Sequence, residues 1–125
     1  MFTTICQTCH GADGNGVASL APPLNKSEWV VGDKNKLISI VLYGLTGPVS
    51  VNGKLYKAPE INGDMPGIFE NKEMSDDDIA ELLNFVRNSW NNKAPKVDAR
   101  DILFVRERNK ERQNAYTVEE LKKLK

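Results

Sequence analysis

The motif Cys6-Gln7-Thr8-Cys9-His10 constrains this 125-residue chain more than any other feature. C-x-x-C-H is the attachment pattern of c-type haem. Two cysteines three residues apart project from the same side of a helical turn, so both thiols can form thioethers with one porphyrin. His10 then lies under the ring, where an imidazole nitrogen can ligate the iron. Because His10 is the only histidine, the motif predicts one haem c anchored by Cys6 and Cys9, without a second histidine ligand.

Other uses of the cysteine pair explain the sequence less well. A thioredoxin-like redox pair normally follows a strand in a βαβ unit, and only five residues precede Cys6. A structural zinc site needs four ligands, whereas the chain contains two cysteines and one histidine. A disulfide between Cys6 and Cys9 would close a very short, strained loop and leave His10 unexplained. We therefore favour haem attachment.

The composition fits one small domain with an appended segment. Hydrophobic residues make up 40% of the chain, so the core is thin and a buried porphyrin would add a large apolar centre. No apolar run approaches the length of a membrane span and no signal peptide precedes the motif, so we expect no integral membrane segment and a soluble chain whose export signal is already absent.

Charge is distributed unevenly along the chain. Residues 1–92 carry seven basic and eleven acidic side chains, whereas residues 93–125 carry ten basic and six acidic ones. A solvated helical face explains the basic excess more simply than nucleic acid, so we expect no nucleic-acid partner.

Apolar periodicity and capping residues predict several short helices. The expected helices are residues 2–10 ending in the motif, 34–43 behind the N-cap Asp33, 76–90 behind the N-cap Ser75, 99–112, and a last short helix behind the capping box at Thr117. Met74, which precedes Ser75, is interpreted as a hydrophobic staple.

Two further patterns define a hairpin and a boundary. Asn52-Gly53 between two short apolar runs predicts a small β-hairpin over residues 49–56. The run from Asn91 to Pro95 breaks the helical pattern. We therefore expect a haem domain over residues 1–92 and a charged helical C-terminal extension over residues 93–125.

The loops after the motif contain candidate contacts for the haem. Gly11, Gly14 and Gly16 permit a turn with positive φ at the porphyrin edge. An iron-bound histidine needs an acceptor for its other ring nitrogen, and proline leaves neighbouring carbonyls available. The carbonyl of Pro22 is our candidate acceptor, and the alternative is that Pro22-Pro23 only stiffens the loop.

The sixth iron ligand decides the chemistry. Of the three methionines, Met65 lies in a loop rich in helix-breaking residues and is the preferred ligand, whereas Met1 is terminal. An open or lysine-bound position is the alternative. A His/Met pair raises the reduction potential and keeps small molecules off the iron, which favours one-electron transfer rather than catalysis. A haem enzyme or gas sensor with an open or weakly ligated distal position is the alternative function.

An ordered set of motifs over about residues 2–92 resembles the class I c-type cytochromes. The set is Cys6-x-x-Cys9-His10-Gly11, Ala21-Pro22-Pro23-Leu24, Trp29-Val30, Val51-Asn52-Gly53 with Tyr56, Met65-Pro66, and Ser75-x-x-Asp78-Ile79 leading to Val86-Arg87-Asn88-Ser89-Trp90. The resemblance implies an all-α class I cytochrome c fold, with three to four core helices around one covalently bound haem.

The resemblance also implies roles for individual residues. They are thioether attachment for Cys6 and Cys9, axial ligation for His10 and Met65, the carbonyl partner of His10 for Pro22, and haem contact for Leu24, Trp29 and Tyr56. Trp29 and Tyr56 can equally be ordinary core aromatic residues.

More narrowly, the chain is similar to bacterial monohaem cytochrome domains associated with periplasmic, quinoprotein-like sugar and alcohol dehydrogenases. This similarity implies a periplasmic or otherwise exported protein that accepts electrons from a dehydrogenase, as a partner or a fused domain. The electrons then pass to a respiratory acceptor, a cytochrome or an oxidase. A freely diffusing carrier with no dedicated partner is the alternative.

The sequence departs from the family pattern in two places. Few residues precede Cys6, and the stretch 57–63 before Met65 is longer than usual. The extension over residues 93–125 has no counterpart among the motifs, and it can serve as a packing arm, a linker or a docking surface.

Overall fold

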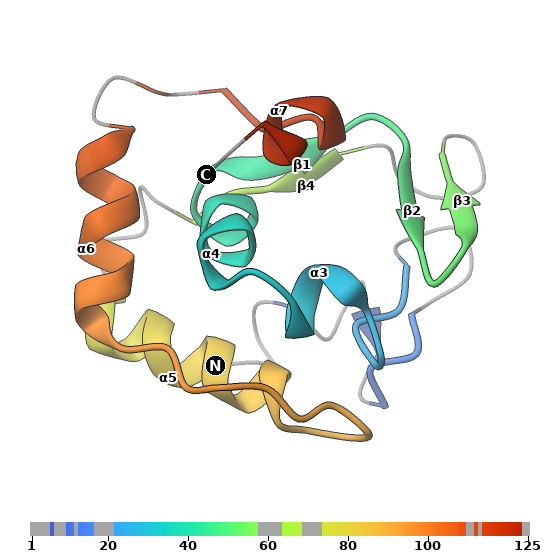
Figure 1. Ribbon diagram of the computed structural model, residues 1–125, viewed down its shortest axis with the longest axis horizontal. Coiled ribbons are helices and arrows are strands. Elements are labelled where there is room, and N and C mark those ends of the chain that lie inside the picture. Colours follow the sequence, from blue (N-terminus) through green and yellow to red (C-terminus); the bar gives the residue numbers. More distant parts are fainter. Residues whose placement is uncertain are drawn as a thin grey trace.

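The computed structural model describes residues 6, 10, 11, 13–16, 22–57, 64–68, 74–109, 112 and 114–123. These residues form a mostly helical structure with two small antiparallel sheets (Figure 1). The helices are α3 (Glu28–Val31), α4 (Lys34–Tyr43), α5 (Asp76–Arg87), α6 (Ala99–Arg108) and α7 (Val118–Lys122). The strands are β1 (Gly44–Thr46), β2 (Val49–Val51), β3 (Lys54–Tyr56) and β4 (Asp64–Pro66).

Helix α4 lies in the middle of the view in Figure 1 and begins and ends where the sequence predicts. The Asp33 carboxylate accepts hydrogen bonds from the backbone N–H groups of Asn35 and Lys36, as an N-cap does. Ile38 and Leu42 are completely buried. The helix therefore contributes mainly to the core.

Helix α5 begins as predicted and ends earlier than predicted. Ser75 and Asp78 form a reciprocal capping box at its start, and Met74 is buried in the core where the predicted staple would lie. The predicted end at residue 90 is wrong, because the helix ends at Arg87. The chain turns over residues 88–91, directly after the helix. In this turn Trp90 adopts a left-handed φ of 56°, which an α-helix does not contain.

Helices α6 and α7 lie in the extension. The predicted end of α6 at residue 112 is wrong, because the helix ends at Arg108. The side-chain amide of Asn109 donates to the Val105 carbonyl at 2.8 Å and so satisfies one of the last carbonyl groups. Helix α7 begins with the predicted capping box between Thr117 and Glu120.

The predicted hairpin is confirmed, and it is attached to a helix that the sequence did not predict. Strands β2 and β3 are antiparallel, with Asn52 and Gly53 in the left-handed region at their turn. The hairpin is joined to α3 by bonds from the Trp29 indole N–H to the Ser50 carbonyl at 2.9 Å and from the Asn52 N–H to the Glu28 carboxylate at 2.8 Å. Helix α3 has four residues, too few to show a helical period.

A second sheet was not expected. Strand β1 continues directly from α4 and pairs with β4, so that Leu45 faces Met65. The expectation that Met65 lies in a loop is therefore wrong. Three-residue strands show no alternation of apolar and polar residues, and their pairing depends on tertiary contacts.

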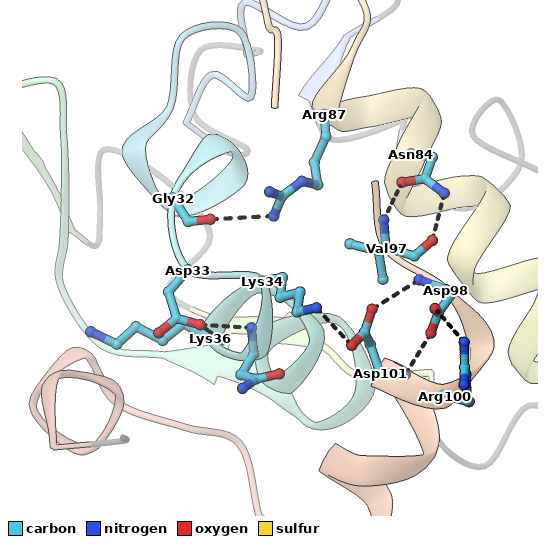
Figure 2. Close-up of polar contacts among 11 residues, drawn as sticks. Gly32, Asp33, Lys34, Lys36, Asn84, Arg87, Val97, Asp98, Arg100 and Asp101 are labelled. Atoms are coloured by element: carbon cyan, nitrogen blue, oxygen red, sulfur yellow. Dashed lines mark hydrogen bonds and ion pairs between the residues drawn. The ribbon is translucent and has the colours of Figure 1, made fainter. Parts of the chain in front are cut away.

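The core is continuous across residue 92. Its buried apolar side chains form one cluster that includes Ile38, Leu42, Ile79 and Leu83 before that residue and Val97, Ile102, Val105, Tyr116 and Leu121 after it. Figure 2 shows polar links beside this core, among them an ion pair of 2.8 Å between Lys34 of α4 and Asp101 of α6. The described part of the extension therefore packs against the core. No helix within the described ranges is long and apolar enough to cross a membrane.

Candidate functional site

The site begins at Cys6 and His10. The backbone N–H of His10 donates to the Cys6 carbonyl at 3.0 Å. The two residues are four positions apart, as in an α-helical hydrogen bond. His10 is buried, with 7% of its surface exposed, and Cys6 is partly buried. Cys9 and the rest of the predicted helix over residues 2–10 lie outside the described residues.

His10 is bonded to the carbonyl that the sequence singled out. Its Nδ1 lies 2.8 Å from the oxygen of Pro22. A carbonyl oxygen can only accept, so Nδ1 carries the proton and Nε2 keeps its lone pair. Burial lowers the pKa of His10, and the bond with Pro22 raises it by a smaller amount. The net effect favours a neutral imidazole, which is the form that ligates a metal.

The loop between His10 and Leu24 is held by backbone hydrogen bonds. The N–H groups of Leu24 and Asn25 both donate to the Gly14 carbonyl at 2.7 Å, and the Gly16 N–H donates to the His10 carbonyl at 2.8 Å. Gly11, Gly14 and Gly16 all have positive φ, as expected. These bonds join Gly16 to His10, and Gly14 to the two residues Leu24 and Asn25 that follow the Pro22-Pro23 pair.

Asn92 anchors this loop to the end of α5, and sequence reasoning missed it. Its side-chain amide donates to the carbonyl groups of Val86 at 2.8 Å and Leu24 at 3.2 Å, and its oxygen accepts from the Lys26 N–H at 2.6 Å. Asn92 is 7% exposed. In the sequence it is part of a run of helix breakers, and only the turn after α5 directs its side chain toward the loop.

Trp90 supports the same loop by close packing. A Cβ atom added at Gly14 would lie 2.5 Å from the Trp90 indole, and the φ of Gly14 is +70°. The loop backbone therefore approaches the ring as closely as glycine alone permits.

Met65 is placed by the sheet between β1 and β4. The residue opposite it is Leu45. Gly44 lets the two strands approach, since a Cβ atom there would collide with the Met65 carbonyl oxygen. Figure 1 shows β1 and β4 side by side near the top of the view.

Four predicted contact residues share one kind of environment. Each is a partly buried side chain that packs against the core, and they are Cys6, Leu24, Trp29 and Met65. Tyr56 differs, because it lies on β3 with the Lys54 ammonium 5.1 Å from its ring centre. The haem contacts of all five residues stay predictions.

The donor set fits a haem better than a metal ion held by protein ligands alone. An imidazole with an available lone pair and a thioether suit the iron of a porphyrin, and a cysteine thiol can form a thioether with the porphyrin itself. The half-buried apolar side chains suit the faces of a flat apolar ring. Within the described residues there is no group of three or more His, Cys, Asp or Glu side chains that could hold a metal ion.

Comparison with known proteins identifies the family. Residues 1–90 match the cytochrome c family. The chain belongs to the cytochrome c family. Members of this family carry electrons on a covalently attached haem, so this cytochrome is an electron carrier.

Three relatives show the range of similar proteins. The cytochrome c subunit of the quinone alcohol dehydrogenase of Gluconacetobacter polyoxogenes is 38% identical over 104 residues, which are 82% of this chain and 20% of the relative. Cytochrome c-552 of Thermus thermophilus is 30% identical over 123 residues, 95% of this chain and 77% of the relative. The gluconate 2-dehydrogenase cytochrome c subunit of Pantoea cypripedii is 33% identical over 112 residues, 85% of this chain and 23% of the relative.

The two kinds of relative differ in coverage. This cytochrome spans about one fifth of the length of the alcohol dehydrogenase subunits. The match to cytochrome c-552 extends past residue 92, since it covers nearly the whole chain.

Proposed function

We propose that this cytochrome holds one haem c through thioethers to Cys6 and Cys9, with His10 and Met65 as the axial ligands. The bond between His10 Nδ1 and the Pro22 oxygen carries the proposal. It fixes the orientation of the ring and leaves Nε2 as the ligating atom, which is how an axial histidine is held. A haem bound there supplies a reversible one-electron couple.

The protein's own residues would adapt that couple to electron transfer. The Pro22 carbonyl accepts a hydrogen bond from the Nδ1–H group, so His10 would stay neutral and fixed in both oxidation states of the iron. The Met65 thioether is a soft, neutral ligand that favours the ferrous state and keeps the sixth position filled. Leu24, Trp29 and Tyr56 would line the haem and exclude water.

The names of the relatives support a proposal about redox partners. Two of the relatives are named as cytochrome subunits of quinone alcohol and gluconate dehydrogenases. We infer that this cytochrome accepts electrons from a dehydrogenase in the periplasm, as a partner or as part of the same protein, and passes them to a cytochrome or oxidase. Its domain organisation would be a haem domain over residues 1–92 with the extension packed against it.

Mass and colour test the attachment. The mature protein should gain the mass of one haem, and the colour should stay with the polypeptide after denaturation. Cys6→Ser and Cys9→Ser should each leave one thioether, and the double variant should lose covalent haem. An unmodified mass for properly matured protein would refute the proposal.

Spectra test the axial ligands. The ferric protein should show the weak far-red band of a sulfur-to-iron bond, and the reduced protein should resist carbon monoxide. Met65→Ala should abolish the far-red band and allow carbon monoxide to bind the iron. Met74→Ala should keep the far-red band and the resistance to carbon monoxide. Rapid binding of carbon monoxide by the unaltered protein would favour the haem enzyme or gas sensor.

A further inference from the structure

Strand β1 connects Met65 to the C-terminal extension. On one edge of β1, Leu45 faces Met65 of β4. On the other edge, Leu45 forms a parallel bridge with Tyr116. The Thr46 N–H donates to the Tyr116 carbonyl at 2.8 Å, and the Tyr116 N–H donates to the Gly44 carbonyl at 3.0 Å. Figure 1 shows α7, whose N-cap Thr117 follows Tyr116, beside β1 and β4.

The Tyr116 side chain is fixed by three contacts. Its hydroxyl donates to the side-chain oxygen of Asn109 at 2.5 Å. Its ring meets the ring of Tyr43 edge to face with centroids 6.0 Å apart, and the Arg112 guanidinium lies 3.5 Å from the ring centre. Tyr116 is 2% exposed. Tyr43 is the last residue before β1, so these contacts also locate the start of that strand.

The segment that presents Tyr116 is held by its own interactions. Arg112 donates to the Ala115 carbonyl at 2.8 Å and to the Glu120 carboxylate at 2.9 and 3.1 Å. Thr117 caps α7, and Leu121 of that helix is completely buried. The segment therefore offers β1 a well-located partner.

We propose that Tyr116 is a positioning residue for Met65. A pair of three-residue strands is marginal by itself, and a third strand on the open edge stabilises it. With Tyr116 in place, β1 forms backbone hydrogen bonds on both of its edges. The position of β1 is then fixed, and β4 pairs with a strand that cannot easily move. The inference rests on the proposed ligation by Met65, and it assigns to the extension a function in the haem site besides core packing.

Three substitutions at Tyr116 separate its contributions. Tyr116→Phe keeps the ring and the N–H, Tyr116→Ala keeps the N–H alone, and Tyr116→Pro removes the N–H that bonds to Gly44. Each variant is matured with haem. The far-red band and carbon monoxide binding are followed with temperature, beside helix content. Amide exchange of residues 64–68 reports on β4 directly.

The expected effects are graded. Tyr116→Phe should resemble the unaltered protein. Tyr116→Ala should lose part of the band, and Tyr116→Pro most of it, while helix content is still native. Amide exchange in residues 64–68 should be about tenfold faster or more in Tyr116→Pro, because local opening becomes easier. If Tyr116→Pro fails to mature, Tyr116→Ala against Tyr116→Phe provides the comparison.

Two controls decide the interpretation. Val105→Ala removes buried volume from α6 and leaves the backbone bonds of the bridge in place, so it should lose the band only when the protein unfolds. If Tyr116→Ala and Tyr116→Pro also keep the band until they unfold, the inference is wrong. Met65→Ala tests the ligand itself. If its band persists, the proposed ligation fails, and unchanged exchange of residues 64–68 in the Tyr116 variants would then overturn the positioning of β4 as well.

Discussion

Asn84 binds the backbone of Val97 with both ends of its side-chain amide. Its Nδ2 donates to the Val97 carbonyl at 2.7 Å, and its Oδ1 accepts from the Val97 N–H at 2.8 Å (Figure 2). Val97 is 1% exposed. The pair joins α5, inside the region that matches the cytochrome c family, to the extension that follows it.

Asn84→Ala should therefore loosen the extension. The substitution leaves a buried N–H and a buried carbonyl without partners, which costs about 1–3 kcal/mol for each group. We expect chemical denaturation to show a loss of at least ~2 kcal/mol. Asn88→Ala is the matched control, because its side-chain bonds are exposed and longer, at 3.2 and 3.4 Å. Equal losses for the two variants would contradict this interpretation.

Asn92→Ala should weaken the loop that carries Pro22. The change deletes three hydrogen bonds at a buried position, including the one to the Leu24 carbonyl. We expect a loss of about 2–4 kcal/mol and faster amide exchange at Leu24 and Lys26. Asn91→Ala is the control, since Asn91 is exposed and bonds to the loop through its backbone N–H. Unchanged amide exchange at Lys26 in Asn92→Ala would show that the Asn92 side chain does not hold this loop.

Gly14→Ala should be more destabilising than an alanine at a glycine with similar φ. The left-handed φ costs about 1–2 kcal/mol, and the collision with Trp90 adds about 1–3 kcal/mol of overpacking. Gly53 has a φ of +85° and nothing within 4 Å of an added Cβ, so Gly53→Ala measures the backbone cost alone. The free energies of unfolding of the two variants give the packing cost by difference, and equal values would exclude the collision.

The ion pair between Lys34 and Asp101 should make stability depend on acidic pH. Burial raises the pKa of the Asp101 carboxyl, but hydrogen bonds from Lys34 and from the Asp98 capping box outweigh it and lower that pKa. A pKa lower in the folded than in the unfolded state stabilises the protein above the unfolded value. This contribution is lost as the pH falls through the folded value.

Lys34→Met tests this dependence. Because the side chains are 45% and 20% exposed, we expect a loss of only about 0.2–1 kcal/mol at neutral pH, which should vanish in acid. Lys36→Met is the control, since Lys36 forms no ion pair within the described residues. A loss that persists after Asp101 is protonated would contradict the assignment to charge.

The parts of the fold that the sequence predicts correctly depend on neighbouring residues. The capping side chains of Asp33, Ser75 and Thr117 bond to backbone groups two or three residues further along the chain. A short stretch of sequence is therefore enough to predict these caps. The Asn52-Gly53 turn is equally local. Helix ends were less predictable, because at Trp90 a contact with Gly14 competes with helical periodicity.

The sequence by itself determined which groups are available to the proposed site: the cysteine and histidine spacing, the proline carbonyl and a small set of possible thioether ligands. Only the tertiary structure decided how these groups are held. Asn92 bonds to residues 66 and 68 positions away, and the strand that carries Met65 takes its place from β1 and, through it, Tyr116. Bonds between distant residues leave no periodic pattern in a sequence, because they form only where the packing of the helices brings the partners together.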